Sequence, residues 1–378
     1  MAYYSIFPEK DTTLYSHPDR KDLNTGGDEI LELVEEKATT GNIMYPSRIL
    51  IQFKNTDIKD VIESKLGGKS VSASLRLFST EHKNLNADNT IEAFPLSQSW
   101  AEGDEKWSSN DPTASNGANW RYRTEDTSSA WVTSSFGSGA TGSFINQAGG
   151  GVWYTGSAFR AENAFQSSPN DLDLDLDVST IVQKFSSSYY QDATYPNGLS
   201  NYGFIIKRPF NTESDTFNAG ELQYFSSNTH TVYPPKLTFK WDDSSYSPSA
   251  GATTLSSGDI FLSLHNNKAT FQRKSKQRFR LTTRKRYPDR TFVTSSNYLD
   301  TQYLPSTSYY SVRDAGTDEV IIPFDTAFTK LSADSEGMYF DLYMEGFQPE
   351  RFYKIMFRSD NNDGIQIFDE DYFFKIVR

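Results

Sequence analysis

The sequence contains no cysteine, no long apolar run and no visible export signal. Without cysteine there are no disulfides, thiol nucleophiles or cysteine-based zinc sites, which favours synthesis in a reducing cytosol. No apolar run reaches the about eighteen residues that suggest a membrane-spanning helix. Residues 1–11 lack a basic region followed by an apolar stretch, so no secretory signal is expected. The chain is expected to be made in a cytoplasm and to have no membrane partner.

The motifs of common enzyme classes are also missing. The four histidines are scattered, and no nucleophile elbow, phosphate-binding loop or dinucleotide fingerprint occurs. Glu102, Asp104 and Glu105 cluster in sequence, which leaves a polysaccharide-degrading enzyme as a third possibility, but no two carboxylates can be paired from sequence. We therefore expect a non-enzymatic protein and assign no catalytic residue.

The net charge of −12 argues against nucleic acid as a partner of the whole molecule. Aromatic residues make up 15% of the chain, with 27 Phe and 22 Tyr, and such chains favour pleated surfaces over helices. Helices are expected only at 57–66 and 179–185. Strands are expected at 48–53, 72–78, 171–178, 202–207, 236–241, 260–264, 278–282, 320–324, 338–343, 353–358 and 373–377.

The polar segment 242–258, DDSSYSPSAGATTLSSG, predicts a linker between two β-domains. The N-terminal domain would cover 1–241 and the C-terminal domain 259–378. The regular strand spacing of the second domain suits an Ig-like β-sandwich. The sequence therefore predicts an all-β protein.

A series of short motifs in the first domain resembles the DNRLRE family of β-sandwich domains, which is similar to jelly-roll carbohydrate-binding modules. The motifs are DTTL at 11–14, SRILIQF at 47–53, SASLRL at 72–77, WAEG at 100–103 with Trp107, LDVS at 176–179, NYGFII at 201–206, FSS at 225–227 and PKLTF at 235–239. Asn119, Trp120, Arg121, Trp131 and the glycines at 149–151 also resemble the family's tryptophan and glycine positions. The resemblance covers about residues 1–241 and implies a jelly-roll-like sandwich.

With this first domain and no visible export signal, the chain resembles structural proteins of tailed phages, especially those of cyanobacterial myophages. It implies a virion protein of the neck, tail or fibre, with other virion proteins and further copies of itself as partners. The alternative is a carbohydrate-binding module that recognises a host surface glycan.

Three aromatic residues are candidates for glycan binding: Trp120, Tyr122 and Trp131. Aromatic planes can stack on sugar faces. They lie in a Gly/Ser-rich stretch, 108–151, that is too long for a structureless loop in a compact domain. The alternative is that these rings pack the stretch against the domain.

The stretch DLDLDLD alternates without a break from 171 to 177. As a strand it places the leucines on one face and four carboxylates on the other. The candidate ligands for calcium, the one possible cofactor, are Asp171, Asp173, Asp175 and Asp177. The alternative is a solvated strand face.

Basic residues concentrate between 268 and 290. In the predicted strand 278–282 the arginines share one face, and Phe279 and Leu281 the other. The candidate interface residues, for an acidic neighbouring subunit, are Arg278, Arg280, Arg284, Lys285 and Arg286. The alternative is an edge strand protected by charge.

Overall fold

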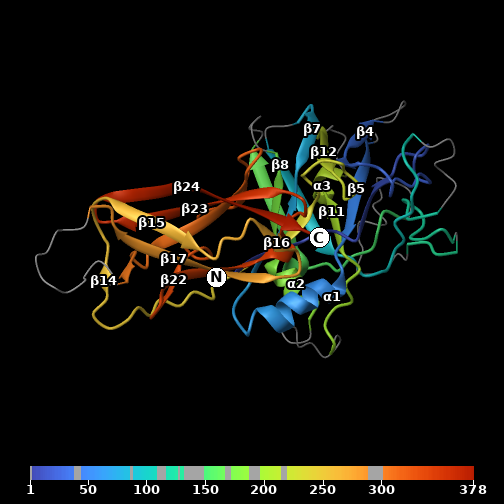
Figure 1. Cartoon of the computed structure of the whole chain (residues 1–378). Coiled ribbons are helices and arrows are strands. Elements are labelled where there is room, and N and C mark those ends of the chain that lie inside the picture. The colour runs from blue at the N-terminus through green and yellow to red at the C-terminus, as the bar shows by residue number, and fades with distance from the viewer. Residues whose placement is uncertain are drawn as a thin grey trace, which may run out of the picture. The chain divides into compact units, whose positions relative to one another are not determined.

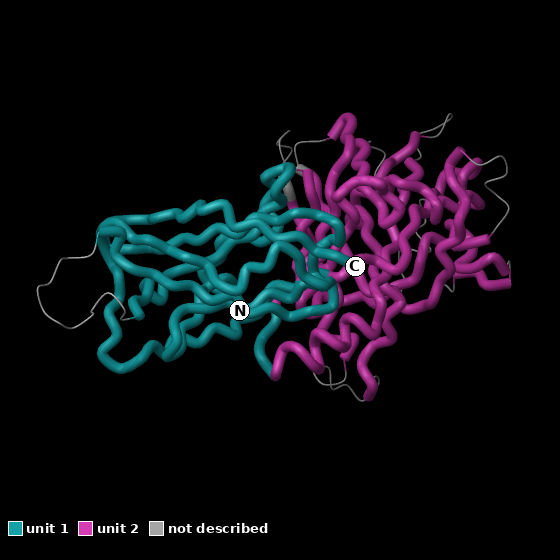
Figure 2. Tube along the Cα trace, viewed as in Figure 1, with its two compact units in different colours: residues 1–5, 68–71, 239–378 teal, residues 6–67, 72–238 magenta. Residues whose placement is uncertain are grey.

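The structure is a computed structural model in which residues 2–37, 44–85, 88–108, 116–126, 128–131, 149–166, 172–186, 196–213, 219–287 and 301–378 are described. It is almost entirely β, which confirms the predicted fold class (Figure 1). Two compact units form (Figure 2): unit 1 contains residues 1–5, 68–71 and 239–378, and unit 2 contains 6–67 and 72–238. The division falls inside β13 (Lys236–Trp241), and β1 (Ala2–Ile6) lies almost wholly in unit 1.

Unit 2 contains a sheet whose two faces are both buried. Its strand order is β2-β5-β11-β8-β9, with β4 also paired to β5. The strands are β2 (Lys10–Tyr15), β4 (Glu35–Lys37), β5 (Met44–Gln52), β8 (Asp88–Pro95), β9 (Ala161–Gln166) and β11 (Phe204–Lys207). Because side chains alternate along a strand, Ile49 and Ile51 lie on one face while Leu50 lies on the other, and all three are fully buried.

The second layer of unit 2 contains two further groups of strands, β13-β6-β10 and β3-β12-β7. The bounds are β3 (Ile30–Leu33), β6 (Ser72–Leu77), β7 (Ser79–Lys83), β10 (Leu174–Asp177) and β12 (Glu221–Phe225). The predicted helices are confirmed as α1 (Asn55–Lys59) with a π-helical turn (Asp60–Lys65), and as α2 (Ser179–Lys184). Short helical turns also occur at Ser157–Phe159 and at α3 (Phe210–Glu213).

A tryptophan-rich segment covers the outer face of the first sheet. Leu50, Ile205 and Phe94 are opposite one another in neighbouring strands and therefore share this face. They form one buried cluster with four tryptophans: Trp100, Trp120, Trp131 and Trp153. These four tryptophans thus pack against Leu50, Phe94 and Ile205 of the sheet.

Unit 1 is a β-sandwich with the strand order of an immunoglobulin-like domain. One sheet places β15-β17-β22-β21 side by side, with β18 also paired to β17 and β14 paired to β18. The other sheet has the order β16-β24-β23-β19-β20. The bounds are β14 (Thr253–Thr254), β15 (Ile260–His265), β16 (Thr270–Gln272), β17 (Lys276–Lys285), β18 (Gln302–Tyr303), β19 (Ser308–Asp314), β20 (Val320–Ile322), β21 (Ser332–Asp334), β22 (Gly337–Tyr343), β23 (Phe352–Asn361) and β24 (Gly364–Val377). An aromatic core including Phe279, Phe340 and Phe357 joins the sheets.

The segment 242–258, predicted to be a linker, packs into unit 1 instead. Leu255 is 3% exposed in the core, and its backbone N–H donates to the carbonyl of Tyr303 (2.7 Å). The Tyr246 hydroxyl donates to the carbonyl of Leu304 (2.6 Å). These two side chains give the polar segment enough contact to fold. Within the described part of the chain, no helix is long and apolar enough to span a membrane.

Candidate functional site: a buried charged row and its cavity

Three charged side chains form a row across neighbouring strands of unit 2. The register places Lys207 of β11 opposite Glu92 of β8, and Glu92 opposite Glu162 of β9. Lys207 lies two residues after Ile205, so the row shares the tryptophan-covered face. The side chains of Lys207 and Glu92 are only 3% and 10% exposed. Burying charges this deeply is costly unless they are paired, so their partners decide whether the row is stable.

Arg48 and Glu213 form the deepest ion pair beside this row. The Arg48 guanidinium donates to both carboxylate oxygens of Glu213 (3.0 Å and 2.7 Å) and to the carbonyl of Gly150 (2.8 Å). Its carbon lies 4.8 Å from the ring centroid of Trp120 and 5.2 Å from that of Trp153. Both charged side chains are at most 2% exposed. The bidentate pair and the carbonyl together use three of the five N–H donors of the guanidinium, and the two rings pack around its charge.

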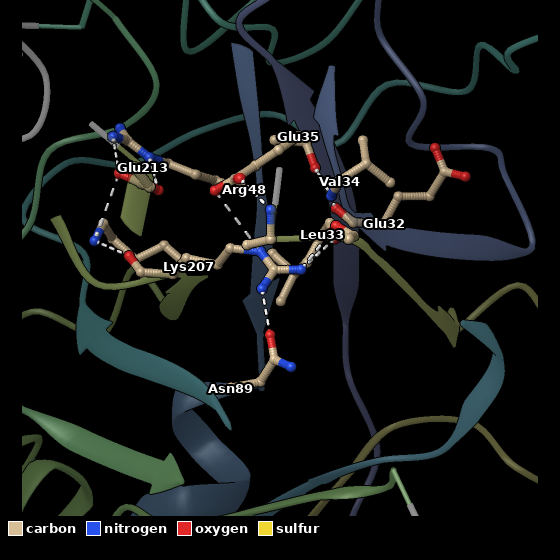
Figure 3. A network of polar contacts seen from close by, with 12 residues as sticks. Glu32, Leu33, Val34, Glu35, Arg48, Asn89, Lys207 and Glu213 are labelled. Atoms are coloured by element: carbon tan, nitrogen blue, oxygen red, sulfur yellow. Dashed lines mark hydrogen bonds and ion pairs between the residues drawn. The ribbon is translucent and has the colours of Figure 1, made fainter. Parts of the chain in front are cut away.

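Glu213 also faces Lys207, so one carboxylate serves two cations (Figure 3). Burial by itself raises the pKa of Glu213, but Arg48 and Lys207 outweigh it and the pKa lies below its ordinary value. Burial lowers the pKa of Lys207, and the nearby Glu213 opposes that shift. The Lys207 ammonium lies 3.6 Å from both Glu213 and Glu92 and donates to the carbonyl of Arg208. The carboxylate is thus held ionised against its burial.

Arg208 provides a second buried cation on the same chain segment. Its guanidinium donates to Asn89 Oδ1 (2.8 Å) and to the carbonyl of Gly220 (2.9 Å). Glu35 lies 4.0 Å from it and accepts a hydrogen bond from the backbone of Ala219 (2.9 Å). Burial lowers the pKa of Arg208, and Glu35 opposes this. These contacts tie the ends of β4, β8 and β11 together.

A cavity of about 390 Å³ opens beside the row. Glu92 and Lys207 line it, and Arg160 bridges Glu92 (2.8 Å) and Glu162 (2.5 Å) while remaining 42% exposed. The other lining residues are Phe94, Trp153, Thr155, Gly156, Ser157 and Phe210. Charged groups and aromatic rings therefore meet at one opening.

A second cavity in unit 2, of about 620 Å³, is strongly acidic. Trp107, 42% exposed, lies in it with the Arg20 guanidinium 4.2 Å from its ring centroid and Tyr15 edge-on at 5.2 Å. Five carboxylates line the cavity with only two cations, Arg20 and Lys106: Asp28, Glu29, Glu32, Glu36 and Glu221. Because Arg20 already covers the tryptophan ring, this cavity offers a poorer platform for a ligand.

The predicted glycan platform does not form, because its tryptophans are buried. Trp120 is fully buried and Trp131 is 2% exposed, so neither can stack on a sugar. Trp131 donates from its ring nitrogen to the carbonyl of Asn119 (2.9 Å). Tyr122 is half-buried, and the Arg121 guanidinium lies 5.2 Å from its ring centroid. The packing alternative explains the two tryptophans.

The predicted aspartate face has the expected alternation but no shared metal site among the residues described. Leu174 and Leu176 are fully buried, while Asp175 and Asp177 are exposed. Each described carboxylate has its own partner: Asp173 accepts from the backbone of Ser79 (2.8 Å), Asp175 lies 3.7 Å from Arg76, and Asp177 accepts from the backbone of Ser179 (3.0 Å). No group of three or more His, Asp or Glu in the described residues could hold a metal ion. Asp171 lies outside them.

The predicted basic patch is partly neutralised by carboxylates from residues that are distant in sequence and become its neighbours through strand pairing. Arg278 donates to both oxygens of Asp341 (2.8 Å and 3.1 Å), since β17 pairs with β22 at this position. Arg280 donates to both oxygens of Asp334 (2.9 Å each) and contacts Glu336. By contrast, three basic side chains at the end of β17 are exposed: Arg284, Lys285 and Arg286.

Sequence reasoning missed the whole charged row. The only sequence signal for the row and for the ion pair beside it was a charged residue next to an apolar strand. Examples are SRILIQF for Arg48 and GFIIKR for Lys207. Such a charge needs a buried partner. The partner of Arg48 is 165 positions away, and no local pattern identifies Glu213.

The sequence was compared with protein-family models and with curated proteins. No protein-family model matches the sequence, and no curated protein matches it. A function for this chain is therefore argued from its own surfaces and cavities.

Proposed function

We propose that this chain is a non-enzymatic structural protein that acts through self-assembly and contacts with neighbouring proteins. The observation that supports this is an apolar face on the outer side of β23 and β24 in unit 1. Four large side chains are 42–65% exposed there: Phe352, Ile365, Ile367 and Phe373. Exposed apolar patches rimmed by polar groups are typical of protein–protein contacts.

The strand register places these four side chains on one face. Lys354 is opposite Phe373, and Arg358 is opposite Ile367, whereas their neighbours Tyr353 and Phe357 are buried in the core. The charges between the apolar groups are already paired: Lys354 with Asp369 (2.7 Å), Arg358 with Asp360 (2.7 Å) and Lys375 with Glu350 (2.7 Å). Lys354 also contacts Asp371 (3.3 Å), so each of these cations has a carboxylate partner in its own chain, and a self-complementary contact through the apolar groups suits this face.

The resemblance of residues 1–241 to DNRLRE domains of tailed-phage structural proteins gives the proposal its setting. In that setting the chain is a virion component of the neck, tail or fibre, where rigid sandwiches present surfaces to neighbouring subunits. Multivalent assembly lets each contact be individually weak.

Light scattering after size-exclusion chromatography, at several concentrations, tests the self-assembly. We expect the mass of a dimer or larger ring, and a shift toward monomer in the double variant Phe352→Glu, Ile367→Glu. Phe210→Glu is the matched control, because Phe210 is 50% exposed but lies in α3 of unit 2, outside β23, β24 and the end of β17. A monomer at every concentration, or unchanged assembly in the double variant, contradicts self-assembly through this face.

The exposed end of β17 provides a separate prediction. If Arg284, Lys285 and Arg286 contact an acidic neighbouring subunit, replacing all three with glutamate weakens assembly, most strongly at low salt. The measurement is the same solution mass over a range of salt concentrations. If the mass does not change at low salt, these residues are a solvated strand end and not an interface.

A further inference from the structure

The acidic cavity of unit 2 contains more negative charge than its own cations neutralise. Of the two cations that line it, Arg20 contacts Glu36, and Lys106 lies 3.6 Å from Glu29. Five carboxylates against two cations leave an excess of three negative charges in the lining. The strand register places Lys83 opposite Glu221, but the Lys83 ammonium is paired with Glu81 (3.4 Å) and does not line the cavity.

The hydrogen bonds that hold Asp28 and Glu32 in this cavity come from neutral groups. Glu32 accepts from the Tyr15 hydroxyl (2.6 Å) and from the Gln223 amide (2.7 Å), and Asp28 accepts from the backbone N–H of Trp107 (3.1 Å). Neutral donors fix a carboxylate but do not cancel its charge. Burial raises the pKa of Asp28, the N–H of Trp107 opposes this, and Glu32 adds to it. The carboxylates thus repel one another, and a cation from outside would relieve that repulsion.

The cavity already holds one guanidinium, which shows the kind of cation that it accommodates. The Arg20 guanidinium carbon lies 4.2 Å from the ring centroid of Trp107, while the same side chain contacts Glu36. Since Arg20 occupies the ring, a further cation would meet the carboxylates and not the indole. The volume of about 620 Å³ leaves room beside Arg20 for a long basic side chain from another molecule.

The end of β17 in unit 1 presents basic side chains to solvent. Arg284, Lys285 and Arg286 are all exposed. The Arg284 guanidinium lies 4.7 Å from the ring centroid of Phe261 and donates to the carbonyl of Lys285 (3.4 Å). In the described part of the chain its contacts are thus a ring and a carbonyl, not a carboxylate. Arg286 is closer to a negative charge, because it shares a small cavity with Asp259. Arg284 is therefore the cation best placed to pair with another molecule.

A second copy of this chain is the partner that fits both surfaces. The net charge of −12 makes two copies repel each other as whole molecules. A contact between the basic end of β17 and the acidic cavity of a neighbour removes part of that repulsion, whereas contact between two acidic surfaces would add to it. Charge complementarity within one sequence therefore favours this pairing of surfaces.

We propose that the basic end of β17 in one copy docks into the acidic cavity of unit 2 in a neighbouring copy, with Arg284 among the cavity carboxylates. This inference rests on the proposed self-assembly and adds a second contact to the apolar face. Because two different surfaces meet, the contact repeats from copy to copy until a ring closes. The apolar face differs from it in being self-complementary.

A charge swap in the full chain tests this contact. The end variant carries Arg284→Glu, Lys285→Glu and Arg286→Glu, and the cavity variant carries Glu29→Lys and Glu221→Lys. Each variant alone should self-associate about tenfold or more weakly at low salt, because like charges then face each other. An equimolar mixture should regain the lost mass, since each variant then meets an opposite charge on the other. Light scattering after size-exclusion chromatography measures all three samples, and high salt should remove the differences.

The matched control is the variant Asp60→Lys, Asp175→Lys, which changes the net charge of unit 2 by the same amount outside the cavity. Both side chains are 50% exposed, and this variant should assemble like the unchanged chain. If the chain assembles but the cavity variant has no effect, or if the mixture does not regain mass, the contact is wrong while self-assembly stands. An equal loss in the control also overturns the contact. An unchanged chain that is monomeric at every concentration contradicts the contact and the proposed function together.

Discussion

Replacing Arg48 with alanine is expected to lower the free energy of unfolding of unit 2 by about 3–5 kcal/mol. The substitution leaves the Glu213 carboxylate, 2% exposed, with Lys207 as its remaining cation. It also removes the donor to the carbonyl of Gly150 and the cation packed against the rings of Trp120 and Trp153. Urea unfolding followed by tryptophan fluorescence measures the change, because five of the six tryptophans are in unit 2.

The matched control is Lys83→Ala, which breaks an exposed pair in the same unit. Lys83 and Glu81 are 52% and 57% exposed and 3.4 Å apart, so their pair should contribute less than about 1 kcal/mol. The double variant Arg48→Met, Glu213→Leu should recover much of the loss, since replacing both charges leaves neither of them buried alone. If Arg48→Ala costs no more than Lys83→Ala, water reaches the pair and its energetic role as described is wrong.

The second large effect is a loss of stability as pH rises, caused by Asp11. Its side chain is 1% exposed, and one carboxylate oxygen accepts from the backbone of Ser227 (2.7 Å). Burial raises the pKa of Asp11 to about 7; the hydrogen bond from Ser227 opposes this, and the neighbouring Glu102 adds to it. The folded protein therefore holds a proton that the unfolded chain has lost above about pH 4. The free energy that Asp11 contributes to folding is therefore fully present below about pH 4 and is lost as pH rises toward about 7.

The expected slope from Asp11 is at most about 1.4 kcal/mol per pH unit between pH 4 and 7. Asp11→Asn removes the titrating carboxylate but keeps an oxygen for Ser227. The stability of this variant relative to the unchanged chain should therefore increase steadily from pH 4 to 7. Urea unfolding at each pH gives both curves. Asp19→Asn, at a side chain 88% exposed, is the control for a general effect of removing one charge. Parallel curves for Asp11→Asn would show that Asp11 does not titrate in this range.

The all-β class was predictable because strand patterns are local. Alternation at Leu174 and Leu176 was enough to place β10, and local sequence also located the two short helices predicted at 57–66 and 179–185. The charged row was not predictable, because it depends on which strands become neighbours. Lys207 meets Glu92 only through the pairing of β11 with β8.

Exposure was the other property that sequence could not decide. Trp120 and Phe210 are both aromatic residues in polar surroundings, yet the first is fully buried and the second half exposed. The same limit applied to the basic patch, where Arg278 is paired by Asp341 from a strand 63 positions away. Residue type suggested which chemistry was possible, and only the register showed where it occurs.

The wide sequence separation of Arg48 and Glu213 also has a consequence for synthesis of the protein. A chain leaving the ribosome presents Arg48 long before Glu213 or its neighbouring strand β11 exists. Strand β5 can pair early with β2 and β4, but its other neighbour, β11, is made much later, which slows folding and prolongs exposure of apolar strand surface. Unit 2 becomes able to close only once translation has passed residue 213, so the timing of its folding depends on the end of the unit and not on its beginning.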